Sequence, residues 1–250
     1  MGNFTFARNV IEDQDQPDYI EKYMNRTGQA RWQTFGYVSD GLFKDEADIA
    51  TSPDQSALGE VRPGDIRYKD LNNDGVIDSK DVKAIGYTDV PEIVYGFGVS
   101  AQWKGFDVSV FFQGNDHVSF SINSSMVRGF TEPKMAANNV FSDIYGNYWT
   151  ESNTDAKYPR LTTTEATNNN QSSDFWLVNG RYLRLKNAEF GYTFPKKLIQ
   201  KIRLSQLRIF VSGTNLLTFA PFKLWDPDLQ TGASNYPNTR VANIGLNIGF

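Results

Sequence analysis

Residues 70–81 have the residue types and spacing of a calcium-binding loop. They read Asp-Leu-Asn-Asn-Asp-Gly-Val-Ile-Asp-Ser-Lys-Asp. The EF-hand pattern places oxygen ligands at positions 1, 3, 5, 7, 9 and 12, and position 7 contributes its backbone carbonyl. Gly75 occupies position 6, where the chain turns sharply, and Ile77 at position 8 is the inward-facing apolar residue. The predicted ligands are Asp70, Asn72, Asp74, Val76, Asp78 and Asp81.

The predicted role of this loop is structural, with Ca2+ as the expected cofactor. Calcium is a hard cation that takes about six to eight oxygen ligands, and this spacing converges them on one point. Position 12 is Asp81 rather than glutamate, and the shorter side chain predicts weaker binding, which still suffices where calcium is plentiful outside a cell. Magnesium is an open alternative. So is a turn of Asp, Asn and Gly residues whose charges are simply solvated.

The rest of the chain offers little catalytic chemistry. It has no cysteine and one histidine, His117, which no Gly-x-Ser-x-Gly segment accompanies. The acidic pairs Asp13/Asp15 and Asp45/Glu46 are interpreted as solvated loop charges. A formal net charge of -4 without a basic stripe argues against nucleic acid as a partner. We predict that the chain is not an enzyme and that it has no catalytic residue.

Outside the 70–81 loop, the main pattern in the sequence is an alternation of apolar and polar residues with a period of two, which predicts β-strands. It is clearest on both sides of Lys104-Gly105, which has the composition of a tight turn. Two antiparallel strands of about ten residues each follow, the length that a tilted strand needs to cross a bilayer. Their apolar positions are Tyr95, Phe97, Val99, Ala101 and Trp103 before the turn and Phe106, Val108, Val110 and Phe112 after it.

Four further segments bring the number of predicted strands to about six. These segments are residues 3–8, 181–194, 205–219 and 240–250. The connections between the strands are asymmetric, because short ones fall at one end and long ones at the other. The short connections are 104–105 and 195–204, and the long segments are 9–91, 117–180 and 220–239.

This arrangement is typical of outer-membrane β-barrels, which combine short periplasmic turns with long extracellular loops. Aromatic residues crowd the predicted strand ends, as an interfacial girdle would, and the face opposite the apolar one is Gly, Ser, Asn and Gln, which suits a wet lumen. The mean hydropathy of -0.48 is compatible with a barrel, whose strands face lipid on one side only. The predicted fold class is therefore all-β, an antiparallel transmembrane β-barrel segment. The alternative is a soluble β-sandwich.

Substrate contacts are weakly indicated. Tyr148 and Trp149 lie in the long segment 117–180, and Trp225 lies in 220–239. These aromatic residues could stack on a sugar or a peptide, but long loops also need apolar side chains for their own packing. The polar stretch 162–173, TTTEATNNNQSS, is expected to be mobile.

The chain resembles the distal barrel of the SusC/RagA family of TonB-dependent transporters. The resemblance covers nearly the whole chain, in order. It lies in GDIRYKDLNNDGVIDSKDVKAIGYTDVPEIVYGFGVSAQWKGFDVSVFFQG, FWLVNGRYLRLKNAEFGYTFPKKL, RIFVSGTNLLTF, TFGYVSDGLF and the terminal strand that ends at Phe250.

This resemblance implies a barrel of about 22 strands with an N-terminal plug, a location in outer-membrane lipid, and nutrient import. The implied partners are a SusD-type surface lipoprotein, the TonB complex acting through the plug, and a glycan or peptide substrate. Phe250 resembles the aromatic signal for outer-membrane assembly. Which substrate is imported does not follow from the sequence.

Within residues 1–250 we find no segment that resembles the family's plug or a signal sequence. We expect residues 1–250 to be the C-terminal portion of the receptor barrel, a fragment that forms a curved open sheet rather than a closed barrel. The leading alternative is an extracellular calcium-stapled β-sandwich that binds carbohydrate. An outer-membrane enzyme on a smaller barrel is the other rival, and the scarcity of catalytic residues argues against it.

Overall fold

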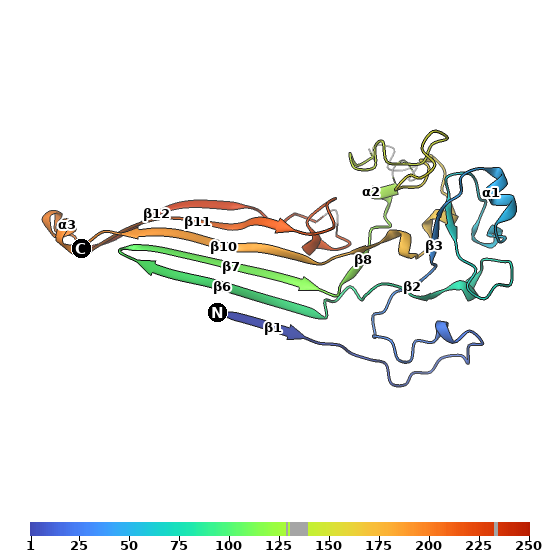
Figure 1. Ribbon diagram of the computed structural model, residues 1–250, viewed down its shortest axis with the longest axis horizontal. Helices are drawn as coiled ribbons and strands as arrows, with labels where there is room; N and C mark the ends of the chain where they lie inside the picture. Colours follow the sequence, from blue (N-terminus) through green and yellow to red (C-terminus); the bar gives the residue numbers. More distant parts are fainter. Residues whose placement is uncertain (129, 131–139, 233–234) are drawn as a thin grey trace.

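The structure is a computed structural model that describes residues 1–128, 130, 140–232 and 235–250. A long antiparallel sheet extends from one side of a layer of loops (Figure 1). The sheet has six strands in the order β1-β6-β7-β10-β11-β12, so that β1 and β12 form its two open edges. The strands are β1 (Gly2–Phe6), β6 (Ile93–Trp103), β7 (Phe106–Asp116), β10 (Tyr182–Thr193), β11 (Gln206–Phe219) and β12 (Val241–Gly249). The predicted open sheet of about six strands is confirmed.

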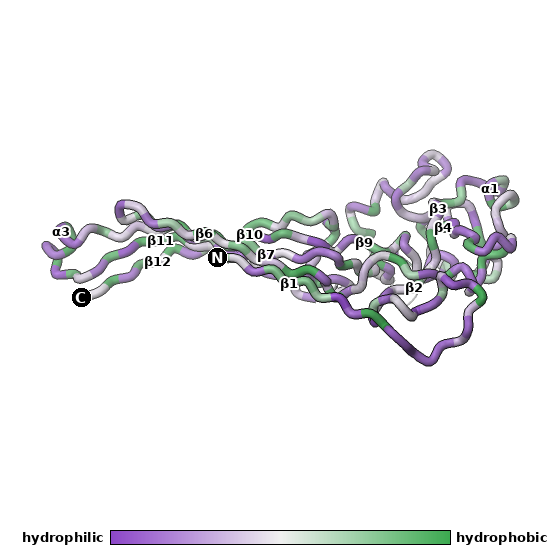
Figure 2. The backbone as a smooth tube through the Cα atoms, turned by 60° about the horizontal axis from the view of Figure 1, so that its bottom comes forward, coloured by the Kyte–Doolittle hydropathy of each residue, from purple (hydrophilic) through white to green (hydrophobic). Residues whose placement is uncertain are grey.

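The register of the sheet places the apolar residues of neighbouring strands on one face. Val99 pairs with Val110, which pairs with Ala188 across the next ladder. On the other side of β10, Phe190 pairs with Val211, and Val211 pairs with Ile244. Because side chains alternate along every strand, one continuous apolar face extends across the sheet. Hydrophobic stretches are visible along these strands in Figure 2.

A β-bulge explains why apolar and polar residues alternate regularly only in the second half of segment 181–194. The pairing of β10 with both neighbours shifts between Leu185 and Asn187, which leaves Lys186 unpaired. An extra residue in one strand reverses the facing of everything beyond it. The apolar face is therefore built by even-numbered residues such as Ala188 after the bulge and by Leu185 before it.

The tight turn between β6 and β7 follows from its two residues. Lys104 and Gly105 have φ angles of 47° and 89°, as a type I′ hairpin turn requires. A Cβ on Gly105 would lie 2.7 Å from the carbonyl oxygen of Thr193, so the position requires glycine. The connection from β10 to β11 holds two short helices, and the long segments lie at the opposite end, as predicted (Figure 1).

The loop layer contains the remaining elements. Among the described residues, no helix combines the length and the apolar character that crossing a membrane needs. Three small two-stranded sheets pair β2 (Phe35–Gly36) with β5 (Lys83–Ala84), β3 (Ser39–Leu42) with β4 (Ile66–Tyr68), and β8 (Ser119–Ser121) with β9 (Leu177–Asn179). The α-helices are α1 (Glu46–Thr51), α2 (Ser125–Arg128) and α3 (Lys196–Ile199). The 3-10 helices are Lys22–Met24, Ser56–Leu58, Ser79–Asp81, Thr167–Asn170, Asp174–Trp176, Gln200–Ile202 and Pro227–Leu229.

The buried core of the protein lies in this loop layer and not under the sheet. Trp176, Tyr68 and Phe120 are each at most 2% exposed and belong to one hydrophobic cluster. By contrast, Val99 in the middle of β6 is 67% exposed. A soluble sandwich would bury its apolar sheet face under a second sheet about 10 Å away. Among the described residues no second sheet covers this face, so the sandwich alternative is not supported.

Candidate functional site

The face opposite the apolar one carries charged side chains that pair with one another. Arg208 on β11 forms ion pairs with Asp107 on β7 and with Glu189 on β10, the latter at 2.6 Å. The guanidinium of Arg208 lies over Gly191, where an added Cβ would approach it to 2.5 Å. These charges pair with one another on the polar face, on the side of the sheet away from the apolar residues. That division is what a wall between lipid and an aqueous lumen needs.

Aromatic residues gather at the end of the sheet that has the short turns. The ring centroids of Phe106 and Tyr192 are 4.6 Å apart, and those of Tyr192 and Phe194 are 5.0 Å apart. Trp103, which is 69% exposed, has the ammonium of Lys104 at 4.7 Å from its ring. Amphipathic aromatic rings beside a lysine are typical of the membrane–water interface.

The first half of the 70–81 loop has the backbone conformation that the metal-binding pattern predicts. Asn73 and Gly75 have φ angles of 61° and 85°, and a Cβ at Gly75 would meet nothing. The carboxylate of Asp70 accepts hydrogen bonds from the N–H groups of Asn73 at 2.6 Å and Gly75 at 2.8 Å. The loop thus winds around the carboxylate at position 1.

The second half of the loop ends in a buried carboxylate. Asp81 is fully buried and accepts hydrogen bonds from the N–H groups of Leu71 at 2.7 Å and Asp78 at 2.9 Å. Asp78 in turn caps the 3-10 helix Ser79–Asp81 by accepting from Lys80 N–H. Asp81 therefore joins the two ends of the loop through hydrogen bonds. Each of its oxygens retains a lone pair for a further partner.

Lys80 lies between two of the predicted metal ligands. Its Nζ is 3.3 Å from Asp74 Oδ2 and 3.5 Å from Asp78 Oδ2. Hydrogen bonds from Asn72, from the N–H of Val76 and from Lys80 lower the pKa of Asp74. Within the described part of the chain, no group of three or more acidic or histidine side chains is close enough to hold a metal. The loop backbone fits a metal site, but Asp74 and Asp78 contact the ammonium of Lys80.

The three aromatic residues that were candidates for substrate contact pack within the loop layer. Tyr148 and Trp149 pack against its hydrophobic cluster, and the Trp149 ring covers Gly64, where a Cβ would approach it to 2.5 Å. Trp225 stacks edge-on against Phe222 at 4.7 Å, and its indole N–H donates to the Gln230 carbonyl at 2.7 Å. Trp225 also lines a cavity, and the buried indole N–H of Trp149 has no hydrogen-bond partner among the described residues.

The polar stretch 162–173 is exposed in its first part but buries two asparagines in its second. Asn168 and Asn169 are 0% and 4% exposed. Asn169 accepts from the N–H of Ile66 at 2.8 Å and donates to Asp65 at 2.8 Å. Asn168 donates to the Ile66 carbonyl at 2.9 Å. These side-chain amides pair with the backbone of β4 as a neighbouring strand would.

Gln55 and Asp65 complete this network, which we call the amide cluster (Gln55, Asp65, Asn168 and Asn169). Gln55 donates to Ile66 O at 2.8 Å and accepts from Tyr68 N–H at 2.9 Å. Asp65 is fully buried and lies 2.7 Å from Arg160 Nε. The amide cluster joins the segment 9–91 to the segment 117–180, which are far apart in sequence. Sequence reasoning missed it because asparagine runs usually indicate solvated loops.

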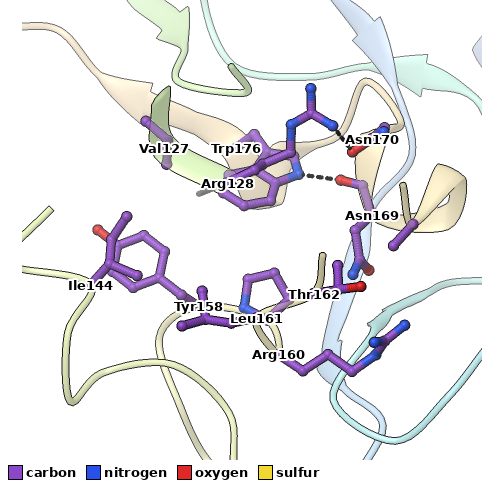
Figure 3. Close-up of a pocket in the computed structure, with 12 residues that line it drawn as sticks. Val127, Arg128, Ile144, Tyr158, Arg160, Leu161, Thr162, Asn169, Asn170 and Trp176 are labelled. Atoms are coloured by element: carbon purple, nitrogen blue, oxygen red, sulfur yellow. Dashed lines mark hydrogen bonds between the residues drawn. The ribbon is translucent and has the colours of Figure 1, made fainter. Parts of the chain in front are cut away.

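A small cavity of about 20 Å3 lies beside the amide cluster. Figure 3 shows Trp176 donating its indole N–H to the carbonyl of Asn169, and Arg128 bound to Asn170. The cavity has room for about one water molecule, which is too little for a nutrient. We interpret it as a packing defect within the loop layer rather than as a binding site.

The single histidine ties three strands together at the loop end of the sheet. His117 Nδ1 lies 3.1 Å from Glu92 Oε2, and the His117 ring stacks on Tyr87 at 4.6 Å. Arg8 donates to both oxygens of Glu92 at 2.7 and 2.6 Å, and this guanidinium lowers the pKa of Glu92. Glu92 precedes β6, Arg8 follows β1 and His117 follows β7, so the cluster fixes where these strands leave the sheet.

Two larger cavities flank the segment 221–225. One, of about 350 Å3, is lined mainly by apolar side chains of the long loops together with Asp143, Lys157 and Tyr158. Hydrogen bonds from Lys157 at 2.8 Å and Tyr158 at 2.9 Å lower the pKa of Asp143. The other, of about 430 Å3, lies against the polar face of the sheet, and its lining includes Arg184, Lys223 and Arg240. Both volumes are in the range of small-ligand sites.

Comparison with known proteins identifies the family. The chain is 30% identical to TonB-dependent receptor P3 of Formosa agariphila over 99% of its own length and 26% of that protein. It is 27% identical to TonB-dependent receptor SusC of Bacteroides thetaiotaomicron, over 76% of this chain and 18% of SusC. The chain belongs to the SusC/RagA family of TonB-dependent receptors. It spans about a quarter of the length of the curated relatives it matches. No family model matches the chain.

Solved structures of this family share the fold. The RagAB peptide transporter superposes with a TM-score of 0.71 at 21% identity, covering 100% of this chain and 27% of that one. The RagAB importer in its closed-closed state gives a TM-score of 0.70. These structures confirm the predicted barrel-segment fold, and the sequence relatives of this SusC/RagA chain confirm the predicted family and outer-membrane location. Its relatives are receptors and transporters rather than enzymes.

Proposed function

We propose that the chain forms part of the wall of an outer-membrane nutrient importer. The observation that carries this proposal is a sheet with one exposed apolar face and one polar face whose charges are paired. Five of its strands, β6, β7, β10, β11 and β12, have 9 to 14 residues. Strands of this length suffice to cross a bilayer at a tilt. The polar face would then line the path of the imported molecule, and the loop layer would form its outer mouth.

The whole importer would have the same kinds of partner as other SusC/RagA transporters. A SusD-type lipoprotein would cap the loop layer, and the TonB complex would act through an N-terminal plug outside residues 1–250. The imported molecule would be an oligosaccharide or a peptide. Phe250, which is 94% exposed, would serve as the aromatic signal for assembly into the outer membrane.

Cysteine labelling tests this placement, because residues 1–250 contain no cysteine. Tyr145 is 76% exposed in the loop layer, and Lys197 lies in α3 at the opposite end of the sheet. We expect Tyr145→Cys, in the full-length gene product, to react with a membrane-impermeant maleimide on intact cells. Lys197→Cys should react only after the outer membrane is permeabilised. Equal labelling of both on intact cells would contradict the proposal.

Transport needs a separate measurement. Cells carrying the full-length gene product should accumulate labelled oligosaccharide or peptide mixtures, and a protonophore should abolish the accumulation because import is driven from the inner membrane. Uptake that continues without the proton gradient would point to passive diffusion through a pore instead.

We also propose that the 70–81 loop binds Ca2+ as a structural ion. The left-handed φ angles at Asn73 and Gly75 and the inward carboxylate of Asp70 support it. Binding would require the exposed Lys80 side chain to swing away so that Asp74 and Asp78 can turn toward the ion. The ion would brace the segment 40–91.

Calorimetric titration tests this site. We expect the full-length gene product to bind Ca2+ with a Kd of about 0.1–1 mM, as extracellular modules do. Asp70→Ala and Asp74→Ala should each abolish the heat of binding. Lys80→Gln should tighten binding, because it removes the competing ammonium. An absence of heat for the parent protein at millimolar Ca2+ would rule the metal site out.

A further inference from the structure

The cavity of about 430 Å3 beside the segment 221–225 is lined by three basic side chains and one carboxylate. Arg184 comes from β10, Lys223 from the loop after β11, and Arg240 from the residue before β12. We propose that this cavity binds a carboxylate group of the imported molecule. This proposal rests on the proposed import function, because the polar face of the sheet then borders the substrate's path.

Arg184 belongs to the polar face and is oriented by neighbouring side chains. It pairs in register with Gln113 and with Thr218, and its side chain is 2% exposed. Its Nε donates to Thr218 Oγ1 at 3.2 Å, and one Nη is bound by Asp226. The negative charge of Asp226 is thereby already matched by Arg184.

The second Nη of Arg184 has no hydrogen-bond partner among the described residues. The acidic oxygen nearest to it, Asp228 Oδ2, is 3.5 Å away and accepts instead from Asn238 at 3.1 Å. Leaving a buried donor unpaired is costly, so such groups usually indicate an absent partner. An oxygen of a bound carboxylate would supply this acceptor, and arginine holds carboxylates well because of its planar fork of donors.

Lys223 and Arg240 bring the charge of this region to a net +1, because Arg184, Lys223 and Arg240 together exceed the two carboxylates of Asp226 and Asp228. Lys223 and Arg240 are both exposed, and neither forms an ion pair with an acidic residue in the described ranges. Asn215 contributes a buried Oδ1 that has no hydrogen-bond partner among those residues, while its Nδ2 donates to Thr239 O at 3.0 Å. The cavity thus offers donors for a carboxylate and one acceptor for an N–H or O–H group attached to it.

The neighbouring apolar cavity extends this recognition. It shares Phe222 and Lys223 with the basic cavity and is lined by Phe175, Val178 and Leu224. A ligand that carries an apolar group next to its carboxylate could therefore occupy both cavities. The carboxylate could come from the C-terminus of a peptide or from an acidic sugar, and the two sources are separated by the choice of probe.

Direct binding to the purified full-length gene product in detergent tests the proposal without transport. The probes are hexa-alanine with a free C-terminus and its C-terminal amide, and trigalacturonate and neutral trigalactose. We expect the acid of at least one pair to bind about tenfold more tightly than its neutral partner at low salt, which corresponds to about 1.4 kcal/mol. Lys223→Gln/Arg240→Gln should lower that ratio to about threefold or less, with the remaining preference due to Arg184.

The control is Lys196→Gln/Lys197→Gln, which removes the same charge from α3 at the far end of the sheet and should keep the tenfold ratio. Arg184 is left intact, because its loss would leave the carboxylate of Asp226 without its buried ion-pair partner and could destabilise the fold. Preference for the acidic peptide alone, or for the acidic sugar alone, would identify the source. Equal binding of acid and neutral partners, or no binding at millimolar concentration, would overturn the proposal. Either result would leave the energised-uptake test of import unaffected.

Discussion

Val99→Arg is expected to lower the free energy of unfolding in a lipid bilayer by about 2–4 kcal/mol, the cost of a basic residue near the bilayer midplane on the lipid face of a barrel. Val99 lies near the middle of β6, is 67% exposed and belongs to the apolar face that extends across the sheet. Lipid would solvate its side chain in the parent protein but not a guanidinium. The measurement is denaturant unfolding of the full-length gene product in lipid vesicles.

Ser100→Arg is the matched control, because Ser100 is the next residue and points to the opposite face. It pairs with Ser109 in β7, so an arginine there would lie on the polar side of the wall. We expect a change in unfolding free energy within about 0.5 kcal/mol, as for a surface substitution. Similar losses at both positions would show that the apolar face does not contact lipid, and a greater loss at Ser100 would reverse the assignment of the faces.

The sheet could be predicted from the sequence because its information is local. Alternation over about ten residues and the composition of Lys104-Gly105 fix both strand length and turn, and the predicted segment 205–219 differs from β11 by a single residue. The bulge at Lys186 could not be predicted, because it exists only in the pairing of β10 with its neighbours. One strand read alone does not show its register.

The structure of the loop layer could be predicted only in part, because many of its contacts join residues that are distant in sequence. The conformation of 70–81 was predictable, because hydrogen bonds such as that from Gly75 N–H to Asp70 join residues within the motif. The place of Lys80 between Asp74 and Asp78 was not, since the pattern leaves that position unspecified. Asn168 and Asn169 were beyond prediction for a different reason, because their partner Ile66 lies 102 residues before Asn168. A polar run read alone has the composition of a mobile loop.

Asn169→Leu is expected to destabilise the loop layer by about 2–5 kcal/mol, although the side chain keeps nearly its size. The substitution removes the acceptor for the buried Ile66 N–H and the donor to the buried Asp65, each at 2.8 Å. The Ile66 N–H left without a partner costs about 1–3 kcal/mol, and the hydrogen bond lost by Asp65, which keeps its contact with Arg160, adds about 1–2 kcal/mol. Hydrogen exchange of the Ile66 and Tyr68 amides would report the loss as lower protection, since exchange measures local opening.

The control for this prediction is Asn147→Leu, which changes an exposed asparagine whose side chain donates to the Asp143 carbonyl. We expect protection of the Ile66 amide to stay within about 0.5 kcal/mol of the parent value. The sheet offers a second control, because β10 pairs through its own backbone and should keep its protection in both variants. If Asn169→Leu left the Ile66 amide as protected as before, the amide cluster would not hold the two long segments together. The position of the outer loops would then depend on the hydrophobic cluster around Trp176 and on backbone hydrogen bonds such as that from Tyr37 N–H to the Ser172 carbonyl at 2.9 Å.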